Sequence, residues 1–182
     1  LASSSAASDV YKRQIINSLK LKGISVLFDK RDTYKPGYKF NEHEIKGVPI
    51  RLVVGPKDIE NSTLEIFRRD KMEKEIIDFG DVESKVDYLL EDIQKCLFEK
   101  AKTFTNLNTR KADTFQEFKE LINNQGGFVS AHWDGTKETE EKIKRETKAT
   151  IRLIPMDGVK EKGNCIYSNK PSYQRVLFAK AY

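Results

Sequence analysis

The stretch that decides the fold spans residues 29–58 and reads DKRDTYKPGYKFNEHEIKGVPIRLVVGPKD. Pro36 and the glycine after it are typical of a helix start, and Gly47 is typical of a helix end. We therefore predict a short helix to about residue 46. On that helix Phe40 and Glu44 are four residues apart and share one face.

Basic residues are concentrated around this predicted helix. They are Lys30, Arg31, Lys35, Lys39, Lys46, Arg51 and Lys57. Together with an aromatic ring and a carboxylate they offer donors, a stacking plane and an acceptor, which an unpaired RNA base needs from a protein. The alternative is a solvated connection whose charges only keep the domain soluble, because basic loops are common.

The run PGYKFNEHEIKGVPIRLVVGPKD resembles the anticodon-binding domain of prolyl-tRNA synthetases, in the form shared by archaea, eukaryotes and some bacteria. It is similar to the family pattern KF-x-x-x-E-x-KGVPIR-x-x-x-GP-[RK]-D. The run LLEDIQKCLFEKA resembles the family's long helix, and the final AKAY matches its terminal tyrosine. The resemblance covers roughly residues 15–182, and Val53 departs from it, since many relatives carry an acidic residue there.

The resemblance and the chemistry of guanine together assign expected roles. Phe40 would stack on a base, and Arg51 and Lys57 would donate to guanine O6 and N7. Glu44 or Asp58 would accept from the Watson–Crick N–H groups of guanine. These positions match family residues that read the two guanines shared by proline anticodons. Phosphate attraction is expected from Lys30, Arg31, Lys35 and Lys39.

Each of these side chains also has a structural alternative. Phe40 could be a core residue, and Glu44 could simply face solvent. Arg51 could form a salt bridge with Asp58. Tyr38, at the helix start, could only pack the loop.

Hydrophobic periodicity predicts the other elements. Strands are expected at 24–28, 50–54, 128–133, 151–154, 165–167 and 176–179, with a hairpin formed by 62–69 and 74–79. Helices are expected to end at Leu21, to run over 81–101 with Asp81 as N-cap, to start at Asp113 or Thr114, and to cover 136–147.

These elements predict two domains. Residues 15–104 would form an α/β anticodon-binding domain with a mixed sheet whose first strand is missing, and residues 105–182 a small α+β domain. The polar stretch 105–112 would be a linker. Residues 1–14, LASSSAASDVYKRQ, are small and polar without a period, so we expect an unstructured leader that is an artefact or, alternatively, a disordered natural tail.

Composition limits the class of protein. The 182 residues are 38% hydrophobic and 34% charged with a net charge of +5, which favours a wet globular surface and a polyanionic partner. No apolar stretch approaches the roughly 20 residues that cross a bilayer, so no membrane partner is expected. Cys96 and Cys165 lie far apart, which predicts a reducing, cytoplasmic compartment.

A zinc site is not expected in the C-terminal domain. Relatives often carry four cysteines there, but Leu153 and Tyr167 occupy two of those positions and Cys165 alone remains. One thiolate cannot make a four-sulfur site. We predict instead that Leu153, Ile166, Tyr167 and Tyr173 pack together in place of the metal.

Catalysis by these residues alone is not expected, because no phosphate loop, nucleophile elbow or paired-histidine motif is present. The resemblance implies that an intact enzyme would use ATP and Mg²⁺ to attach proline to its tRNA. It also implies a missing catalytic domain that forms a homodimer and that receives the Tyr182 carboxylate. The alternative is a non-catalytic RNA-binding or protein-interaction module.

Overall fold

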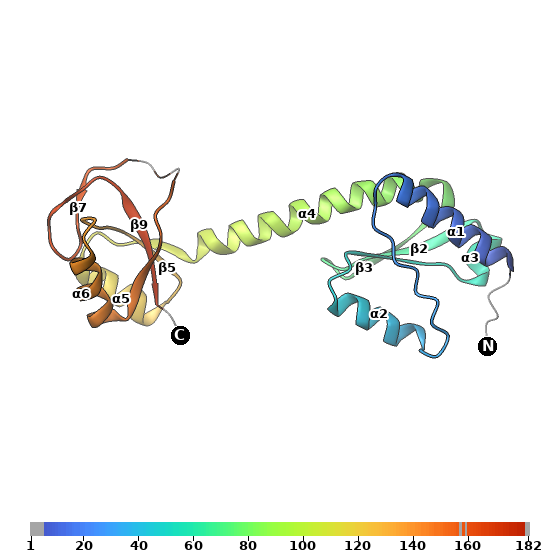
Figure 1. The fold of residues 1–182 in the computed structure, drawn as a ribbon, viewed down its shortest axis with the longest axis horizontal. Helices are drawn as coiled ribbons and strands as arrows, with labels where there is room; N and C mark the ends of the chain where they lie inside the picture. The colour runs from blue at the N-terminus through green and yellow to red at the C-terminus, as the bar shows by residue number, and fades with distance from the viewer. Residues whose placement is uncertain (1–5, 157, 159, 181–182) are drawn as a thin grey trace. The chain divides into compact units, whose positions relative to one another are not determined.

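The computed structural model describes residues 6–156, 158 and 160–180 (Figure 1). The chain divides into two compact units, residues 1–100 and 101–182, which we call unit 1 and unit 2 and describe separately. None of the described helices is long and apolar enough to span a membrane.

Unit 1 is built on a three-stranded antiparallel sheet with the order β1-β2-β3. Its elements are α1 (Ala6–Leu21), α2 (Pro36–Ile45), β1 (Ile50–Val53), α3 (Pro56–Glu60), β2 (Thr63–Arg68), β3 (Glu73–Asp78), a 3-10 turn (Phe79–Asp81) and most of α4 (Val82–Leu107). The predicted α2, β1 and β2–β3 hairpin are confirmed. The helix predicted from Asp81 is confirmed as α4 but ends six residues later, at Leu107, and Asp81 itself lies in the 3-10 turn.

The two faces of this sheet are covered by different helices. Leu64 and Ile66 of β2 are buried in a hydrophobic core with Leu19 of α1 and Val86 of α4. Because side chains alternate along a strand, Phe67 lies on the opposite face. There α2 covers the sheet, so α1 and α2 lie on opposite sides of it (Figure 1).

The expected unstructured leader is wrong over residues 6–14, because α1 begins at Ala6. These residues continue the helix that ends at Leu21, as predicted, before Gly23 with its positive φ of 80°. Tyr11 anchors the added turns by stacking on Phe79, with ring centroids 5.4 Å apart. Residues 1–5 lie outside the described part of the chain.

The strand predicted at 24–28 is also wrong. The segment forms no strand ladder, although Ile24 and Val26 pack against the core and Leu27 is 74% exposed. Burial alternates along the segment as in a strand, but the segment pairs with no described strand. Correspondingly, β1 pairs only with β2 in the described sheet, and its other edge is unpaired.

Unit 2 contains a four-stranded mixed sheet with the order β4-β5-β9-β6. Its elements are the end of α4, β4 (Thr109–Lys111), α5 (Phe115–Asn124), β5 (Phe128–His132), α6 (Lys137–Thr147), β6 (Ala149–Leu153), β7 (Gly163–Asn164), β8 (Pro171–Ser172) and β9 (Arg175–Lys180). Phe118 and Phe178 meet edge to face in its core, with centroids 5.1 Å apart. The α/β and α+β fold class is confirmed, but the sheet of unit 1 is antiparallel over its described strands and not mixed as predicted.

Capping residues explain which boundaries of unit 2 were predictable. Thr114 accepts from the Glu117 N–H at 3.2 Å and starts α5, as expected.

The linker predicted at 105–112 is wrong, because α4 continues to Leu107 and β4 follows. Asn108 and Thr109 donate side-chain hydrogen bonds to the last carbonyls of α4 and so favour helix over loop. The strand predicted at 165–167 is a turn.

Candidate nucleic-acid interface

Three of the predicted site residues meet on the α2 face of unit 1. The Arg51 Cζ atom lies 3.9 Å from the centroid of the Phe40 ring, and Arg51 Nη1 donates to Glu44 Oε1. A residue that the sequence did not single out joins them: the Phe67 ring centroid is 4.2 Å from Arg51 Cζ. We call Phe40, Glu44, Arg51 and Phe67 the arginine clamp.

Strand register builds the clamp. Arg51 of β1 and Phe67 of β2 are direct cross-strand partners, so their side chains share a face of the sheet. Phe40 and Glu44 share one face of α2, as predicted, and reach Arg51 from the other side. The side chains of Arg51 and Glu44 are only 18% and 25% exposed.

The clamp fixes the guanidinium but leaves it incompletely bonded. Arg51 Nε is buried and has no hydrogen-bond partner among the described residues. Leaving a buried donor unpaired costs about 1–3 kcal/mol, whereas each desolvated cation–π contact contributes up to about 2 kcal/mol. The two rings and the carboxylate therefore hold Arg51 in place while part of its donor capacity is unused.

Lys57 and Asp58 are not brought into the clamp. Asp58 Oδ2 accepts from the Gly55 N–H at 2.7 Å and caps α3, which explains why Asp58 does not pair with Arg51. Lys57 is exposed on the same short helix. Among the residues that the structure describes, neither side chain has a hydrogen bond or ion pair to the clamp.

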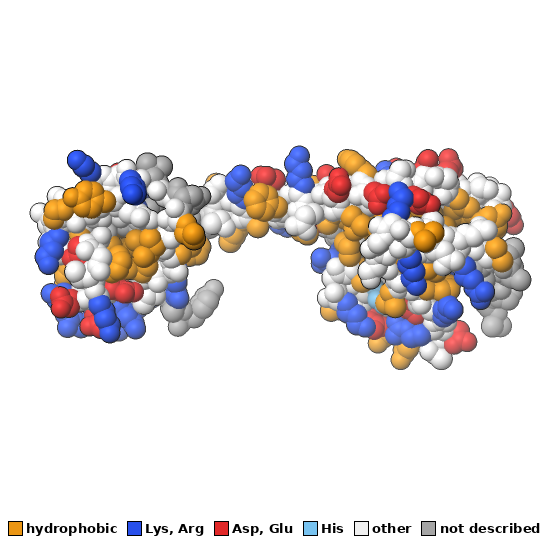
Figure 2. All heavy atoms as spheres, turned by 45° about the horizontal axis from the view of Figure 1, so that its top comes forward, with side chains coloured by type: hydrophobic (Ala, Val, Ile, Leu, Met, Phe, Trp, Pro, Cys, Tyr) orange, Lys and Arg blue, Asp and Glu red, His pale blue; other side chains and the backbone are white. Residues whose placement is uncertain are grey.

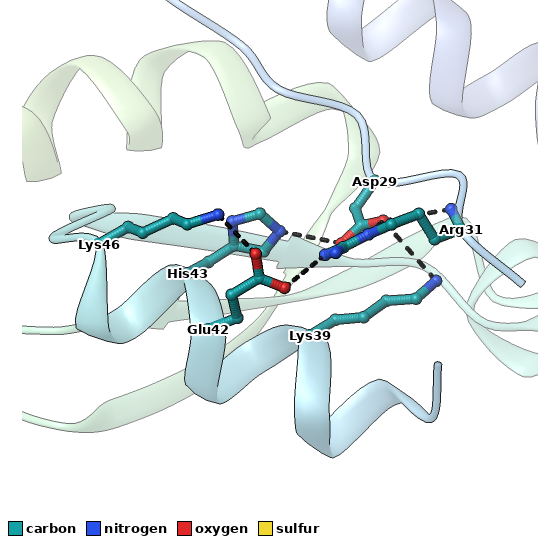
Figure 3. A network of polar contacts seen from close by, with 6 residues as sticks. All are labelled: Asp29, Arg31, Lys39, Glu42, His43 and Lys46. Atoms are coloured by element: carbon teal, nitrogen blue, oxygen red, sulfur yellow. Dashed lines mark hydrogen bonds and ion pairs between the residues drawn. The ribbon is translucent and has the colours of Figure 1, made fainter. Parts of the chain in front are cut away.

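A second polar network holds the outer side of α2 (Figure 3). Asp29 accepts from Arg31 Nε at 2.9 Å and Nη2 at 2.6 Å, and its Oδ2 lies 2.9 Å from His43 Nε2. Arg31 Nη2 also donates to Glu42 at 2.8 Å, and Lys39 Nζ lies 3.9 Å from Asp29. Hydrogen bonds from Arg31 above all hold the pKa of Asp29 well below its usual value.

This network divides the four predicted phosphate contacts. Arg31 and Lys39 are paired with Asp29, whereas Lys30 and Lys35 are exposed and form no ion pair with any described residue. Figure 2 shows Lys and Arg side chains, with Asp and Glu between them, on the part of unit 1 that α2 occupies. The surface is therefore mixed rather than uniformly basic.

Tyr38 stacks on Tyr34, with ring centroids 4.7 Å apart and planes at 16°. Arg31 Cζ lies 5.1 Å from the Tyr34 ring. Both tyrosines remain about half-exposed, so the pair packs the loop before α2 without being buried.

Two family models match this chain. The model described as "Anticodon binding domain" matches residues 3–89, and the model described as "Prolyl-tRNA synthetase, C-terminal" matches residues 115–182. The chain is 56% identical over 163 residues to the proline–tRNA ligase of Flavobacterium johnsoniae and 53% identical over 177 residues to that of Porphyromonas gingivalis. Over most of its length the chain is therefore similar to the C-terminal part of prolyl-tRNA synthetases.

Its coverage of these relatives is partial. The two alignments include 90% and 97% of this chain but 33% and 36% of the relatives, so the chain spans about a third of their length. The crystal structure of the prolyl-tRNA synthetase from Cryptosporidium parvum with L-proline and AMP is similar over 98% of this chain and 38% of that one, with a TM-score of 0.88 and 34% identity.

The predicted packing substitute for a family zinc site is only half right. Ile166 is buried, and Tyr167 packs edge to face on Phe115 with centroids 4.9 Å apart. Leu153 and Tyr173 are 45% and 65% exposed, so their predicted contribution to the packing is wrong.

The described residues hold no group of three or more His, Cys, Asp or Glu suited to a metal ion. Zinc does not fit this donor set, and Tyr182 lies outside the described residues.

In unit 2 a carboxylate holds the turn that follows Cys165 in place. Asp134 accepts from Ser168 Oγ at 2.6 Å, from Thr136 N–H at 3.0 Å and Oγ1 at 2.8 Å, and from Thr139 Oγ1 at 2.8 Å. Burial opposes ionisation, but these hydrogen bonds outweigh it and lower the pKa of Asp134 to about 2. No sequence pattern predicts this link, because Asp134 and Ser168 are 34 residues apart along the chain.

Proposed function

We propose that unit 1 reads the anticodon of a proline tRNA, as part of an enzyme that attaches proline to that tRNA with ATP and Mg²⁺. The observation that carries the proposal is the arginine clamp, which places a guanidinium, a carboxylate and an aromatic ring together on the α2 face. The matches to the anticodon-binding model and to bacterial proline–tRNA ligases support it. The residues described here receive no role toward ATP or Mg²⁺.

Within this proposal each residue keeps a distinct task. Arg51 and Lys57 donate to guanine O6 and N7, and Glu44 accepts from guanine N–H groups through the oxygen that Arg51 leaves unused. Asp58 Oδ1 is a second acceptor, since only Oδ2 bonds to the α3 backbone. The ring of Phe40 supports a base, although Arg51 already occupies part of its surface.

Lys30 and Lys35 contribute most of the attraction to phosphates. Both are exposed, and neither forms an ion pair with an acidic group among the described residues. Arg31 and Lys39 contribute less to phosphate binding, because Asp29 neutralises part of their charge.

The proposal extends to the whole enzyme. We infer the subtype shared by archaea, eukaryotes and some bacteria, which is supported by bacterial relatives above 50% identity and by the similar structure from the eukaryote Cryptosporidium parvum. We also infer a catalytic domain that forms a homodimer, and a cytoplasmic location.

The test is the Arg51→Ala variant of the complete synthetase. The KM for proline tRNA should rise or tRNA charging should fall. Proline-dependent ATP–pyrophosphate exchange should stay nearly intact, because only tRNA charging requires the anticodon. Lys95→Ala, which removes an exposed cation from α4, is the matched control. Equal loss in both assays would indicate a folding role for Arg51 and contradict the proposal.

A further inference from the structure

Phe67 is a buried aromatic residue that lies outside the hydrophobic cores of the described residues. Its exposed fraction is 8%, yet it belongs to neither of the two hydrophobic core clusters formed by the described residues. Its neighbour in sequence, Ile66, does belong to the core. Phe67 therefore contributes to the opposite, α2-facing side of the sheet.

The partner of Phe67 on that side is Arg51. The two residues are paired in register between β1 and β2, and the guanidinium carbon lies 4.2 Å from the Phe67 ring centroid. Phe40 approaches the same guanidinium from α2 at 3.9 Å. A planar guanidinium that contacts two rings and donates to Glu44 loses the rotation that a free arginine keeps.

This immobilisation matters because Arg51 is the central donor of the proposed function. A free arginine would lose side-chain entropy on binding a base edge, whereas a clamped one has lost it beforehand. The unbonded Arg51 Nε indicates that the guanidinium is held by its surroundings and not by saturating its donors. Phe67 itself is too buried to stack on a base.

We propose that Phe67 is a positioning residue for RNA recognition: its ring fixes the plane of the Arg51 guanidinium so that the remaining N–H groups meet an unpaired guanine. This inference rests on the proposed function and adds a residue to it. Phe67 acts through Arg51, so removing its ring should weaken guanine recognition without changing the general attraction of RNA.

The experiment measures binding of the 182-residue chain to two synthetic RNA hairpins. The loop of one carries the two guanines shared by proline anticodons, and the loop of the other carries adenines in their place. Phe67→Leu keeps an apolar side chain but removes the ring, and Phe67→Tyr keeps the ring. Phe67→Leu should weaken binding of the guanine hairpin roughly 3- to 10-fold and leave binding of the adenine hairpin unchanged. Phe67→Tyr should bind both hairpins as the wild type does.

A double-mutant cycle separates positioning from a structural role. If Phe67 acts through Arg51, Phe67→Leu should cause no further loss in an Arg51→Ala chain. The inference would be overturned if Phe67→Leu reduced affinity for the guanine hairpin equally in the wild-type and Arg51→Ala backgrounds. It would also be overturned if Phe67→Leu bound the guanine hairpin normally while Arg51→Ala did not. Wild-type binding without guanine preference would instead overturn the proposed function.

Thermal unfolding of every variant guards against a trivial loss of structure. Phe67→Met provides a second ring-free side chain if Phe67→Leu does not fold. Should both variants be unfolded under the binding conditions, the ring is required for the fold, and the positioning role is overturned.

Discussion

The side chains of Asp29 and Arg31 are joined by two hydrogen bonds, from Nε to Oδ1 at 2.9 Å and from Nη2 to Oδ2 at 2.6 Å. In such a bidentate pair, two N–H groups of the guanidinium are already bonded within the protein and are not available to a phosphate. Arg31 is therefore part of the support of α2, and the sequence alone could not distinguish it from its exposed neighbours Lys30 and Lys35.

We predict from this difference that Lys35→Ala will reduce the salt dependence of RNA binding. Loss of one phosphate contact should lower the slope of log K against log salt by about 0.7 for single-stranded RNA. The measurement is the affinity of the chain for the guanine hairpin across a series of KCl concentrations. Lys95→Ala is the control, and equal slopes for Lys35→Ala and wild type would contradict the prediction.

Asp29→Asn should loosen α2. This helix has no fully buried residue, so it depends on the Asp29 network and the arginine clamp. We expect the amide protons of α2 to exchange about tenfold faster, since a charged hydrogen-bond network is lost, while those of α4 stay unchanged. Hydrogen exchange followed by mass spectrometry or NMR measures this.

The control for that prediction is Asp32→Asn, which removes the same charge from an exposed position nearby. The pKa of Asp29 is lowered in the folded state, so its contribution is present above the ordinary carboxylate pKa and is lost as the pH falls below it. Unchanged exchange in α2 at neutral pH would refute the role of the network.

Asp134→Asn should destabilise unit 2 by about 2 kcal/mol at neutral pH, because a carboxylate that accepts four hydrogen bonds is replaced. The folded pKa of about 2 lies below the ordinary value of 3.8, so the stabilisation is present above about pH 4 and disappears as the pH falls toward 2. Trp133, the only tryptophan, is the neighbouring residue and reports denaturant unfolding of unit 2 by fluorescence.

Glu141→Gln is the matched control for Asp134→Asn. Its ion pair with Lys137 spans 3.8 Å between side chains that are 66% and 86% exposed, and such surface pairs contribute little. A destabilisation by Asp134→Asn that persists unchanged at pH 2 would show that the lost carboxylate charge is not the cause.

Local signals predicted most of the fold, and long-range pairing explains the failures. Pro36, Gly47 and Thr114 mark helix ends through their own backbone and capping preferences, so α2 and α5 were predictable. The segment 24–28 has the composition of a buried strand, but a strand requires a partner that composition cannot supply. The polar sequence of 105–112 concealed that its side chains cap α4.

The candidate site was predictable in part for the same reason. Phe40 and Glu44 share a helix face by spacing alone, and the family pattern pointed to Arg51. The contribution of Phe67 depends on the register between β1 and β2, which cannot be read from the sequence. One signal was available: in LEIF, two adjacent apolar residues, Ile66 and Phe67, indicate that both faces of the strand are covered.

The most direct test of the central claim is the NMR signal of the Arg51 Nε–H group, assigned by its loss in Arg51→Ala. The account predicts that this signal shifts when the guanine hairpin is added to the chain and does not shift with the adenine hairpin. An Arg51 Nε–H signal that stays unchanged at saturating guanine hairpin, while signals elsewhere in unit 1 move, would contradict the claim that the arginine clamp reads guanine.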